Sequence, residues 1–599
     1  MKCVRYGIIG AMALGLIGST ASRALAVAYA SNVTKTGTSV SFILNSPADV
    51  LKYSINGGAP IMLDGTTKGA KSFNLGSASD TFSIIAERND AVGFTIPITG
   101  TIGDAGTGWA SGLSQQSNLS GLNILSEDSN VLNRFFSPRG IAVSQNPNAP
   151  NFGTTYISNS ATGSVPVAGD APARTLAGEG IYALKADQTD AYGYGDTGQN
   201  PNASDGFPSF STASTNSPFR VSVGQNGDVY VADYSDVNGN VFQLNPSLTT
   251  SQIMLEGIGG PGYVPPAPAP FPDGTAIPPG QNHGSISSIW VEGSFAEGNL
   301  VMYAVDEDIN SAHFGGTEQN DRNSVWRYDI GSLPGPNGSN VVPTKIGGGL
   351  MGGFPAGGIL IDMERGLDGK FYLSQNRSVG NEVGIQVIDA SGVEVFNSLT
   401  KTRELLANPA AVDIFRQVFE IAVSPDQKWL AAIVNVGDVV VMPLIDGIPD
   451  ITARMVVDTL PNVNSARGIA FDAAGNIHYV SSGQQLYRIL APGGESVATT
   501  TWNGTEYVFD VEMLTTPVGL PGDFNNDNVV NGNDFLLWQR GGSPVPNSAS
   551  DLALWKAHFG ETAPPATASA AAVPEPSTLV GGLVAAAFGV AATRRRKAA

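Results

Sequence analysis

The chain of 599 residues is long enough for several domains, and it is acidic, with 52 aspartates and glutamates against 32 lysines and arginines and a formal net charge of −20. Only 14% of the residues are charged, 42% are hydrophobic, and there are 73 glycines and 38 prolines. This balance excludes wholesale disorder and argues against a nucleic-acid partner, which needs clustered basic side chains. The many turn formers, with 25 phenylalanines and 16 tyrosines, favour strands, so we expect a mainly β protein.

The first 26 residues have the pattern of a secretory signal peptide. A basic start precedes an apolar stretch at 8–18 that is too short to span a membrane, and small residues at 24 and 26 suit a cleavage site. The single cysteine, Cys3, lies within this leader. We therefore expect an exported mature chain without disulfides, thiolate catalysis or cysteine-bound zinc.

Residues 31–105 alternate apolar and polar positions in short runs. Turn sequences such as Asn56-Gly57-Gly58 separate these runs. This pattern is typical of a small antiparallel β-sandwich, because one face of each strand is buried and the other is solvated. No residue pattern in this region carries chemistry, so we expect a spacer or packing module.

Residues 106–515 contain a degenerate repeat, whose unit is an apolar run, a glycine-containing turn and a second run that ends in a polar residue. The six copies begin with SPRGIAV (137–143), SPFRVSV (217–223), SISSIWV (285–291), IDMERG (361–366), FEIAVSPD (419–426) and RGIAFD (467–472). Copies at this spacing predict the blades of a six-bladed β-propeller. A long β-sandwich is the alternative, and the repeated strand–turn–strand unit argues against it.

The repeat resembles those of NHL-type and gluconolactonase-like propellers. Gluconolactonase-like propellers hold calcium with Glu, Asn and Asp, so the resemblance implies a metal that polarises a lactone or ester oxygen. The candidate carboxylates at strand ends are Asp233, Asp306, Asp308, Asp362, Glu364 and Glu420. Such residues also cap turns and pair with arginines between blades. The roles open to these carboxylates, from the most to the least favoured, are therefore packing, ligand binding in a groove, and catalysis.

Other catalytic patterns are missing from the sequence. His283, His313 and His478 fall at different points of the repeat, so we expect structural histidines and no three-histidine metal site. The chain has no GxSxG elbow, no HExxH pair and no phosphate-binding Gly-Lys-Ser/Thr loop. The catalytic residues of the propeller, if it has any, therefore stay unassigned.

Residues 519–562 carry the most specific local signal, a loop with oxygen-bearing residues at the spacing of an EF-hand-type calcium site. Side-chain or backbone oxygens at loop positions one, three, five, seven, nine and twelve come from Asp523, Asn525, Asp527, Val529, Asn531 and Asp534. Hard oxygen ligands in this pattern favour calcium. Two departures are Asn528 at position six, where glycine is usual, and the short aspartate at position twelve.

The loop and the helix after it resemble a type I dockerin module. DFLLWQR (534–540) is echoed by DLALWKA (551–557), and the loop before the second copy lacks acidic ligands, so one calcium is predicted. The resemblance implies a cohesin-like partner, often in polysaccharide-degrading assemblies. We expect Trp538 and Trp555 to pack between the helices, and residues 563–573 to be a flexible linker.

The C-terminal segment 574–597 combines three features. Pro574, Glu575 and Pro576 come first, an apolar stretch follows, and a basic cluster at 594–597 ends it. This arrangement resembles the PEP-CTERM sorting signal, which implies a transient membrane helix, an exosortase-like processing enzyme and delivery to the cell surface. The whole combination resembles large surface proteins of planctomycete-like bacteria.

The sequence therefore predicts an exported cell-surface protein that has a sandwich, a propeller, a one-calcium module and a sorting signal. The first functional hypothesis is binding or scaffolding, with a glycan or protein bound on the propeller face. The alternative is a calcium-dependent hydrolase or lactonase that acts on sugar-derived esters or in polysaccharide breakdown. The alternative requires a metal among the propeller carboxylates, and the first hypothesis does not.

Overall fold

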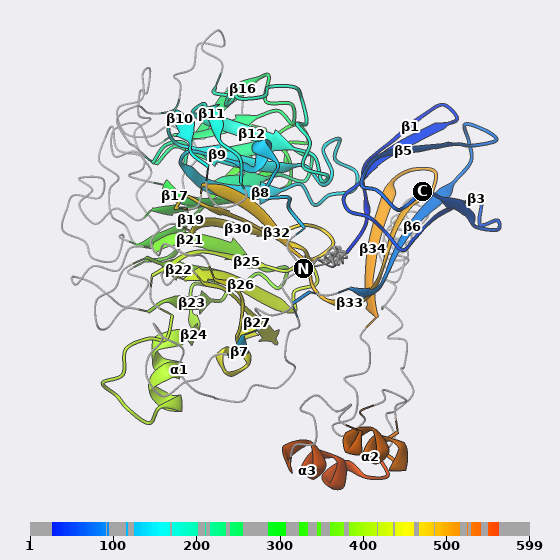
Figure 1. Cartoon of the computed structure of the whole chain (residues 1–599). Helices are drawn as coiled ribbons and strands as arrows, with labels where there is room; N and C mark the ends of the chain where they lie inside the picture. The colour runs from blue at the N-terminus through cyan, green and yellow to red at the C-terminus, as the bar shows by residue number, and fades with distance from the viewer. Residues whose placement is uncertain are drawn as a thin grey trace, which may run out of the picture. The chain divides into compact units, whose positions relative to one another are not determined.

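The computed structural model describes most of residues 27–514 and, after them, Phe524, 529–540 and 549–561 (Figure 1). The gaps within 27–514 are 92, 95–115, 118–124, 168–170, 202–209, 211–215, 235–239, 256–285, 307–322, 333–343, 349–359, 377–382, 416, 435–437, 460–465 and 484. The chain forms two compact units, 1–514 and 515–599. The leader 1–26, the linker 563–573 and the sorting signal 574–597 all fall outside the described residues.

Antiparallel sheets follow one another along the larger unit. In chain order they are β8 (Pro138–Val143), β9 (Thr155–Asn159) and β12 (Gly180–Leu184); β13 (Val221–Val223), β14 (Val229–Ala232), β15 (Val241–Leu244) and β16 (Ser251–Leu255); β17 (Ile286–Glu292), β18 (Leu300–Asp306), β19 (Ser324–Gly331) and β20 (Thr344–Gly347); β21 (Leu360–Arg365), β22 (Phe371–Gln375), β23 (Ile385–Ile388) and β24 (Glu394–Asn397); β25 (Val418–Val423), β26 (Trp429–Val434), β27 (Asp438–Ile445) and β29 (Met455–Thr459); and β30 (Ala466–Phe471), β31 (Ile477–Ser481) and β32 (Leu486–Leu490). Short additions are β10 (Gly163–Val165), β11 (Arg174–Ala177), β28 (Ile448–Pro449) and α1 (Ser398–Leu405).

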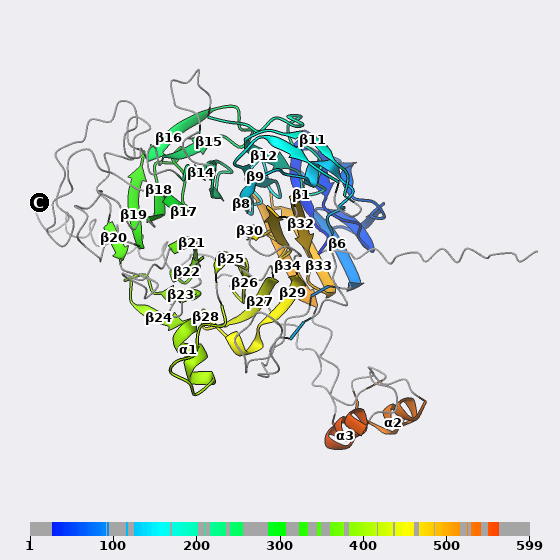
Figure 2. The same ribbon diagram turned by 60° about the vertical axis from the view of Figure 1, so that its left-hand side comes forward.

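The first strands of these sheets form a closed ring. Each of β8, β13, β17, β21 and β25 contacts the first strand of the next sheet, and β30 contacts both β25 and β8. Figure 2 shows the sheets arranged around a common centre in chain order. A ring of radially arranged antiparallel sheets is a β-propeller, as the repeat predicts.

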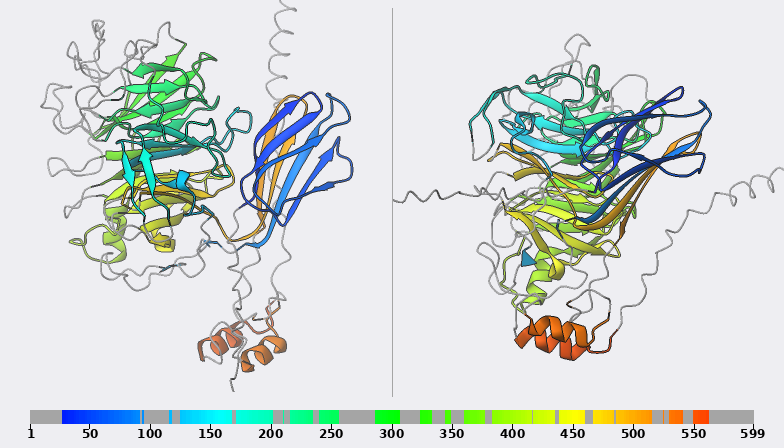
Figure 3. Two further views of the ribbon diagram at one scale, coloured as in Figure 1. Left: turned by 45° about the horizontal axis from the view of Figure 1, so that its top comes forward. Right: turned by 45° about the vertical axis from the view of Figure 1, so that its right-hand side comes forward.

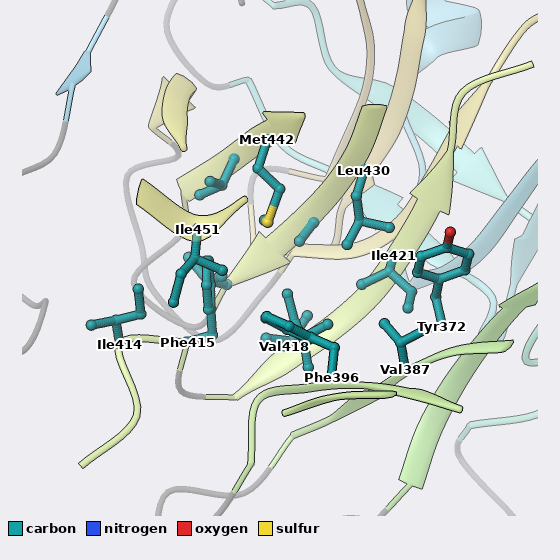
Figure 4. Close-up of a cluster of buried hydrophobic side chains, with 14 of the residues drawn as sticks. Tyr372, Val387, Phe396, Ile414, Phe415, Val418, Ile421, Leu430, Met442 and Ile451 are labelled. Atoms are coloured by element: carbon teal, nitrogen blue, oxygen red, sulfur yellow. The ribbon is translucent and has the colours of Figure 1, made fainter. Parts of the chain in front are cut away.

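Each sheet of the propeller is buried on both faces, because a hydrophobic cluster lies between every two neighbouring sheets. Figure 4 shows the cluster between the sheets of β21 and β25, in which Tyr372 and Val387 of one sheet pack with Ile421 and Leu430 of the other. A further cluster, with Ile141 and Val480, joins the sheets that contain β8 and β30. Burial on both faces explains why strands such as β27 are continuous apolar runs and do not alternate.

The segment before β8 closes the ring from the outside. Leu125 donates its N–H to the carbonyl of Ile489 at 2.8 Å, Phe135 donates to Gln485 at 3.1 Å, and Arg488 pairs with Asp128 at 2.7 Å. These residues follow the free edge of β32, and β7 (Gln116–Ser117) pairs in parallel with β29. Residues from the start of the propeller therefore cover the outer strands of its last two sheets, and this pairing resists opening of the ring.

The sandwich combines strands from the two ends of the larger unit (Figure 3). One sheet contains β1 (Ala30–Thr36), β2 (Ser39–Leu44) and β5 (Gly69–Asn74); the other contains β34 (Tyr507–Leu514), β33 (Gly494–Trp502), β6 (Phe82–Ala91), β3 (Val50–Ile55) and β4 (Ile61–Leu63). The predicted boundaries 31–105 and 106–515 are corrected here, because the hairpin at 494–514 belongs to the sandwich. The sequence analysis places no strand of the sandwich at 494–514, because the partner strand β6 lies about 400 residues away and leaves no local signal; β6 pairs with β33 along its whole length.

Hydrogen bonds connect the sandwich to the propeller within the larger unit. The Asn476 side chain accepts the N–H of Val27 at 3.2 Å, and Asn148 forms two bonds with the backbone of Tyr507, at 2.7 and 2.9 Å. A small apolar cluster that includes Tyr29 and Phe152 covers the same boundary. The propeller is thus an insertion between the paired sandwich strands β6 and β33. The contacts above also attach it to the sandwich.

The second unit contains two short helices, α2 (Gly532–Gln539) and α3 (Ala549–His558). The ring of Phe535 lies 4.7 Å from that of Trp555 and 5.5 Å from that of Trp538, so Trp555 packs between the helices as expected. Val530 is fully buried and exchanges backbone hydrogen bonds with residues 560 and 561. Among the described residues, no helix is long and apolar enough to cross a membrane.

Candidate functional site

An equivalent irregularity bends the first strand of every propeller sheet. The pairing register shifts between Pro138 and Gly140 in β8, and at the matching place in β17, β21, β25 and β30. Before β13, Ala232 pairs with both Phe219 and Arg220, which is the same bulge. A bulge redirects the side chain that follows it. The residues in this position are Gly140, Arg220, Ser288, Asp362, Glu420 and Gly468.

Arg220 reaches across the ring from this position. Its guanidinium donates to the carbonyls of Arg139 and Phe419, and to that of Arg467 at 2.7 Å. It also pairs with Glu420 at 2.7 Å, and its Nε lies 3.7 Å from Asp362. One buried side chain therefore contacts four other sheets of the ring. We call Arg220, Asp362, Glu364 and Glu420 the central ion cluster.

The carboxylates of the central ion cluster bind the backbone of the next first strand. Asp362 accepts the N–H of Ile421 at 2.9 Å, and Glu420 accepts that of Ile469. The inner edge of a first strand has no neighbouring strand, so its polar groups need other partners. These side chains supply the partners and connect neighbouring sheets, which is the packing role that the sequence placed first among its alternatives.

The environment of the three carboxylates is unfavourable for negative charge. Burial raises the pKa of Asp362, and the Arg220 guanidinium opposes this rise. Burial also raises the pKa of Glu420 well above its usual value, and Asp362 adds to the rise while Arg220 opposes it. The pKa of Glu364 is likewise well above its usual value because of burial and the nearby Asp362.

Glycine follows the bulge in the first strands β8 and β30, whose backbone carbonyls bond Arg220. A Cβ on Gly140 would lie 2.6 Å from the carbonyl oxygen of Phe219, and one on Gly468 would lie 3.0 Å from the backbone nitrogen of Ile141. The two glycines therefore allow the first strands to approach closely. This approach brings the carbonyls of Arg139 and Arg467 within reach of a single guanidinium.

The other predicted carboxylates are not part of this cluster in the described structure. Asp233 is buried after β14, and its N–H bonds the carbonyl of Asn240 at 2.8 Å. Asp306 ends β18, and its side chain and all of Asp308 lie outside the described residues. Asn159, at the matching strand end, accepts the N–H of Ser137 at 2.7 Å, which is a turn-capping role.

Among the described residues, no group of three or more His, Cys, Asp or Glu side chains is arranged to hold a metal ion. In the central ion cluster the cation next to Asp362 and Glu420 is Arg220. Arg220 therefore already supplies a positive charge beside these two carboxylates. The structure therefore brings three of the six predicted carboxylates together, in an arrangement that suits an ion-paired core.

His478 belongs to a buried polar network at the boundary with the sandwich. Its Nδ1 lies 2.8 Å from the Tyr487 hydroxyl and its Nε2 lies 3.3 Å from Asp472, which also accepts from Asn476 at 2.7 Å. The histidine is thus structural, as expected. The sequence analysis did not anticipate the role of Asn476, and the Gly475-Asn476 turn was the available signal.

The described part of the calcium-type loop is folded around Asp534. This buried carboxylate accepts the N–H of Phe524 and that of Asn531, each at 2.8 Å, and Asn531 caps α2. The Trp555 indole donates to the Asn531 carbonyl at 2.7 Å. The second and twelfth loop positions are therefore in contact. Asp523, Asn525 and Asp527 lie outside the described residues.

The ring of sheets defines the larger unit as a β-propeller protein. No protein-family model matches the chain, and no curated protein matches it. Among solved structures, the chain is similar to a structural-genomics protein of unknown function from Bacteroides thetaiotaomicron, with 12% identity, a TM-score of 0.34 and coverage of 78% of this chain and 98% of that one. It is also similar to the WD40 β-propeller domain of Doa1, with 12% identity, a TM-score of 0.32 and coverage of 64% and 98%.

Proposed function

We propose that this protein is an exported, cell-surface binding and scaffolding protein whose six sheets are the blades of one propeller. The observation that carries this proposal is the central ion cluster, in which Arg220 connects first strands from four other sheets. A centre filled with ion pairs stiffens the ring and leaves its outer faces for binding. The ligand on such a face is a glycan or a protein.

Binding and hydrolysis predict different results in one experiment. The full chain is incubated with a panel of surface polysaccharides and sugar lactones, with and without EDTA, and both retention and product release are measured. The scaffold predicts retention on at least one polysaccharide without product release. Product release that EDTA abolishes would overturn the proposal in favour of the calcium-dependent hydrolase or lactonase.

The second unit is proposed to bind one calcium ion through Asp523, Asn525, Asp527, Val529, Asn531 and Asp534. The buried Asp534 supports this assignment, because its carboxylate accepts the N–H of Phe524, the residue at the second loop position, and that of Asn531 at the ninth. Hard oxygen donors in this set suit calcium. A cohesin-like protein is the partner that the dockerin resemblance implies.

Calcium titration calorimetry on the full chain tests this site. Asp523→Ala should abolish one calcium-binding event, whereas Asn533→Ala, next to the predicted ligand Asn531 and with its side chain exposed, should leave it unchanged. Unchanged calcium binding in Asp523→Ala would overturn the assignment. Export is tested separately, by locating the chain in cells with and without an exosortase-like enzyme after substitution of Pro574, Glu575 and Pro576.

A further inference from the structure

An asparagine–glycine pair lies at the tip of the hairpin between β33 and β34. Six such pairs occur in the sequence, and the four at 56–57, 226–227, 503–504 and 531–532 lie in the part of the chain that the structure describes. In such a pair the backbone nitrogen of glycine can attack the side-chain amide of asparagine, because glycine has no Cβ that obstructs the approach. The hydrogen bonds around each pair therefore determine which of them is free to react.

The side-chain oxygen of Asn503 is held by three donors of its own turn. It accepts the N–H of Thr505 at 2.9 Å, the Thr505 hydroxyl at 2.8 Å and the N–H of Glu506 at 3.0 Å. Attack on the amide carbon places a negative charge on this oxygen. Donors that already point at the oxygen stabilise that charge, as they do in an oxyanion hole.

The leaving amide nitrogen of Asn503 is unbonded. Among the described residues, no group accepts a hydrogen bond from Nδ2 of Asn503 or from the N–H of Gly504, and both residues are exposed. The nitrogen that attacks and the nitrogen that leaves are therefore both open to water, which can exchange protons with them.

The other three described pairs hold the leaving nitrogen in a hydrogen bond. Nδ2 donates from Asn56 to the Asp80 carboxylate at 2.8 Å, from Asn226 to that of Asp228 at 2.7 Å, and from Asn531 to the carbonyl of Val529 at 3.1 Å. The N–H of Gly227 also donates to the Gly224 carbonyl at 2.9 Å. A bonded amide must break its hydrogen bond before it leaves, and a carboxylate beside it opposes the negative charge that forms on the oxygen.

We propose that Asn503 is a site of spontaneous deamidation and reacts faster than the other described asparagine–glycine pairs. The Gly504 nitrogen gives its proton to water or hydroxide and bonds to Cγ of Asn503, the Cγ–Nδ2 bond breaks, and ammonia leaves with a proton from water. Water then opens the resulting succinimide at either carbonyl and leaves aspartate or isoaspartate at position 503. The reaction needs no oxidant or cofactor, and it is independent of the proposed binding function.

The modification affects a turn that adjoins the propeller. Isoaspartate carries the main chain through the side-chain carbons of residue 503 and so lengthens the turn before Tyr507. The backbone of Tyr507 forms two hydrogen bonds with Asn148 of the propeller, at 2.7 and 2.9 Å. Isoaspartate formation should therefore weaken this attachment between the sandwich and the propeller.

Incubation of the full chain at pH 7 and pH 9, followed by peptide mapping with mass spectrometry, tests the proposal. Asn503 should be converted about tenfold faster than Asn56 or Asn226, because no hydrogen bond to the leaving nitrogen has to be broken. Conversion should be faster at pH 9, since the glycine nitrogen reacts after it loses its proton. Asp80→Ala frees Nδ2 of Asn56 and should accelerate conversion there about tenfold. Asp64→Ala, which removes an exposed carboxylate bonded to Thr66, is the matched control and should leave the rate at Asn56 unchanged.

The same incubation in urea separates the effect of the fold from that of the local sequence. Urea removes the hydrogen bonds of the folded chain, so the preference for Asn503 should disappear. A preference that persists in urea would overturn the role of the hydrogen bonds, and equal rates at the four pairs in the folded chain would overturn the site. A rate at Asn503 that is the same at pH 7 and pH 9 would overturn the succinimide step. If Asp80→Ala fails to fold, the ranking of the four pairs in the unaltered chain still decides.

Discussion

Buried carboxylates have different bonding partners in the central ion cluster and in the loop around Asp534. In the propeller, Asp362 and Glu420 lie against the cationic side chain of Arg220. In the second unit, the buried Asp534 accepts two backbone N–H groups, and a guanidinium has no part in those two bonds. A carboxylate that is neutralised by the protein's own cation is committed to packing. A carboxylate that accepts from neutral donors can also serve an external cation, which is the role proposed for Asp534.

A third carboxylate shows the cost of burial with neutral donors. Asp413 accepts the N–H of Gly384 at 2.8 Å and that of Phe415 at 3.0 Å, and it bonds the Ser398 hydroxyl. Burial nevertheless raises its pKa to about 6, against the opposing effect of these bonds. Neutral donors thus only partly offset the effect of burial on this carboxylate.

Arg220→Met should destabilise the larger unit by about 3–5 kcal/mol, because it leaves Asp362 and Glu420 buried without a cation. Urea unfolding followed by tryptophan fluorescence measures the loss. The control Arg327→Met removes an exposed pair with Asp329 and should change stability by less than about 1 kcal/mol. Equal effects of the two variants would contradict the packing role of the central ion cluster.

A compensating variant sharpens this prediction. Adding Asp362→Asn and Glu420→Gln to Arg220→Met removes the unpaired negative charges, so much of the lost stability should return. The same urea titration measures it. A triple variant that is no more stable than Arg220→Met would show that the guanidinium acts through its bonds to the backbone carbonyls and not through the carboxylates.

Asp413→Asn should change the pH dependence of stability. The folded pKa of Asp413, about 6, lies above its unfolded value, so its contribution is complete below about pH 4 and is lost as the pH rises through 6. The stability of the unaltered chain relative to Asp413→Asn should therefore fall by about 2 kcal/mol between pH 4 and pH 7. Unfolding at several pH values measures this difference.

Asp389 provides the matched control for that slope. It lies in an exposed turn where bonds from Ser391 and Val393 lower its pKa. Its stabilising contribution is therefore present above its unfolded pKa and lost at lower pH, so Asp389→Asn should show the opposite sign. The same sign in both variants would contradict the assigned role of burial at Asp413.

Asn476→Ala should destabilise the larger unit by about 2 kcal/mol, because it removes a buried donor to Asp472 and an acceptor for the N–H of Val27. Proteolysis of the first residues should also become faster, since Val27 loses its attachment. Asn200→Ala is the control, because that exposed side chain forms one long bond of 3.4 Å. Equal stability of the two variants would rule out a role for Asn476 in holding the sandwich strand.

Trp555→Phe should weaken calcium binding about fivefold, because it removes the indole N–H that bonds the Asn531 carbonyl at 2.7 Å while keeping an aromatic ring against Phe535. Calcium titration calorimetry measures the change. Trp502→Phe, in the sandwich, should leave the affinity unaltered. An unchanged affinity in Trp555→Phe would show that the Trp555 indole N–H does not contribute to calcium binding.

Local patterns determined the elements of this protein. Glycine turns between apolar runs predicted the strand pairs of the propeller, and the helix expected at 534–540 is present as α2. Alternation predicted the strands of the sandwich. These signals are local because backbone turns and caps depend on neighbouring residues.

Only the tertiary structure decided which strands pair and which charges meet. The hairpin at 494–514 pairs with β6, although the whole propeller lies between them in the sequence. Arg220 meets Asp362 and Glu420, which come from other sheets. Such contacts depend on closure of the ring, which brings residues from distant repeats to one point. A repeat specifies where each side chain lies in its own sheet, and closure of the ring determines its neighbours.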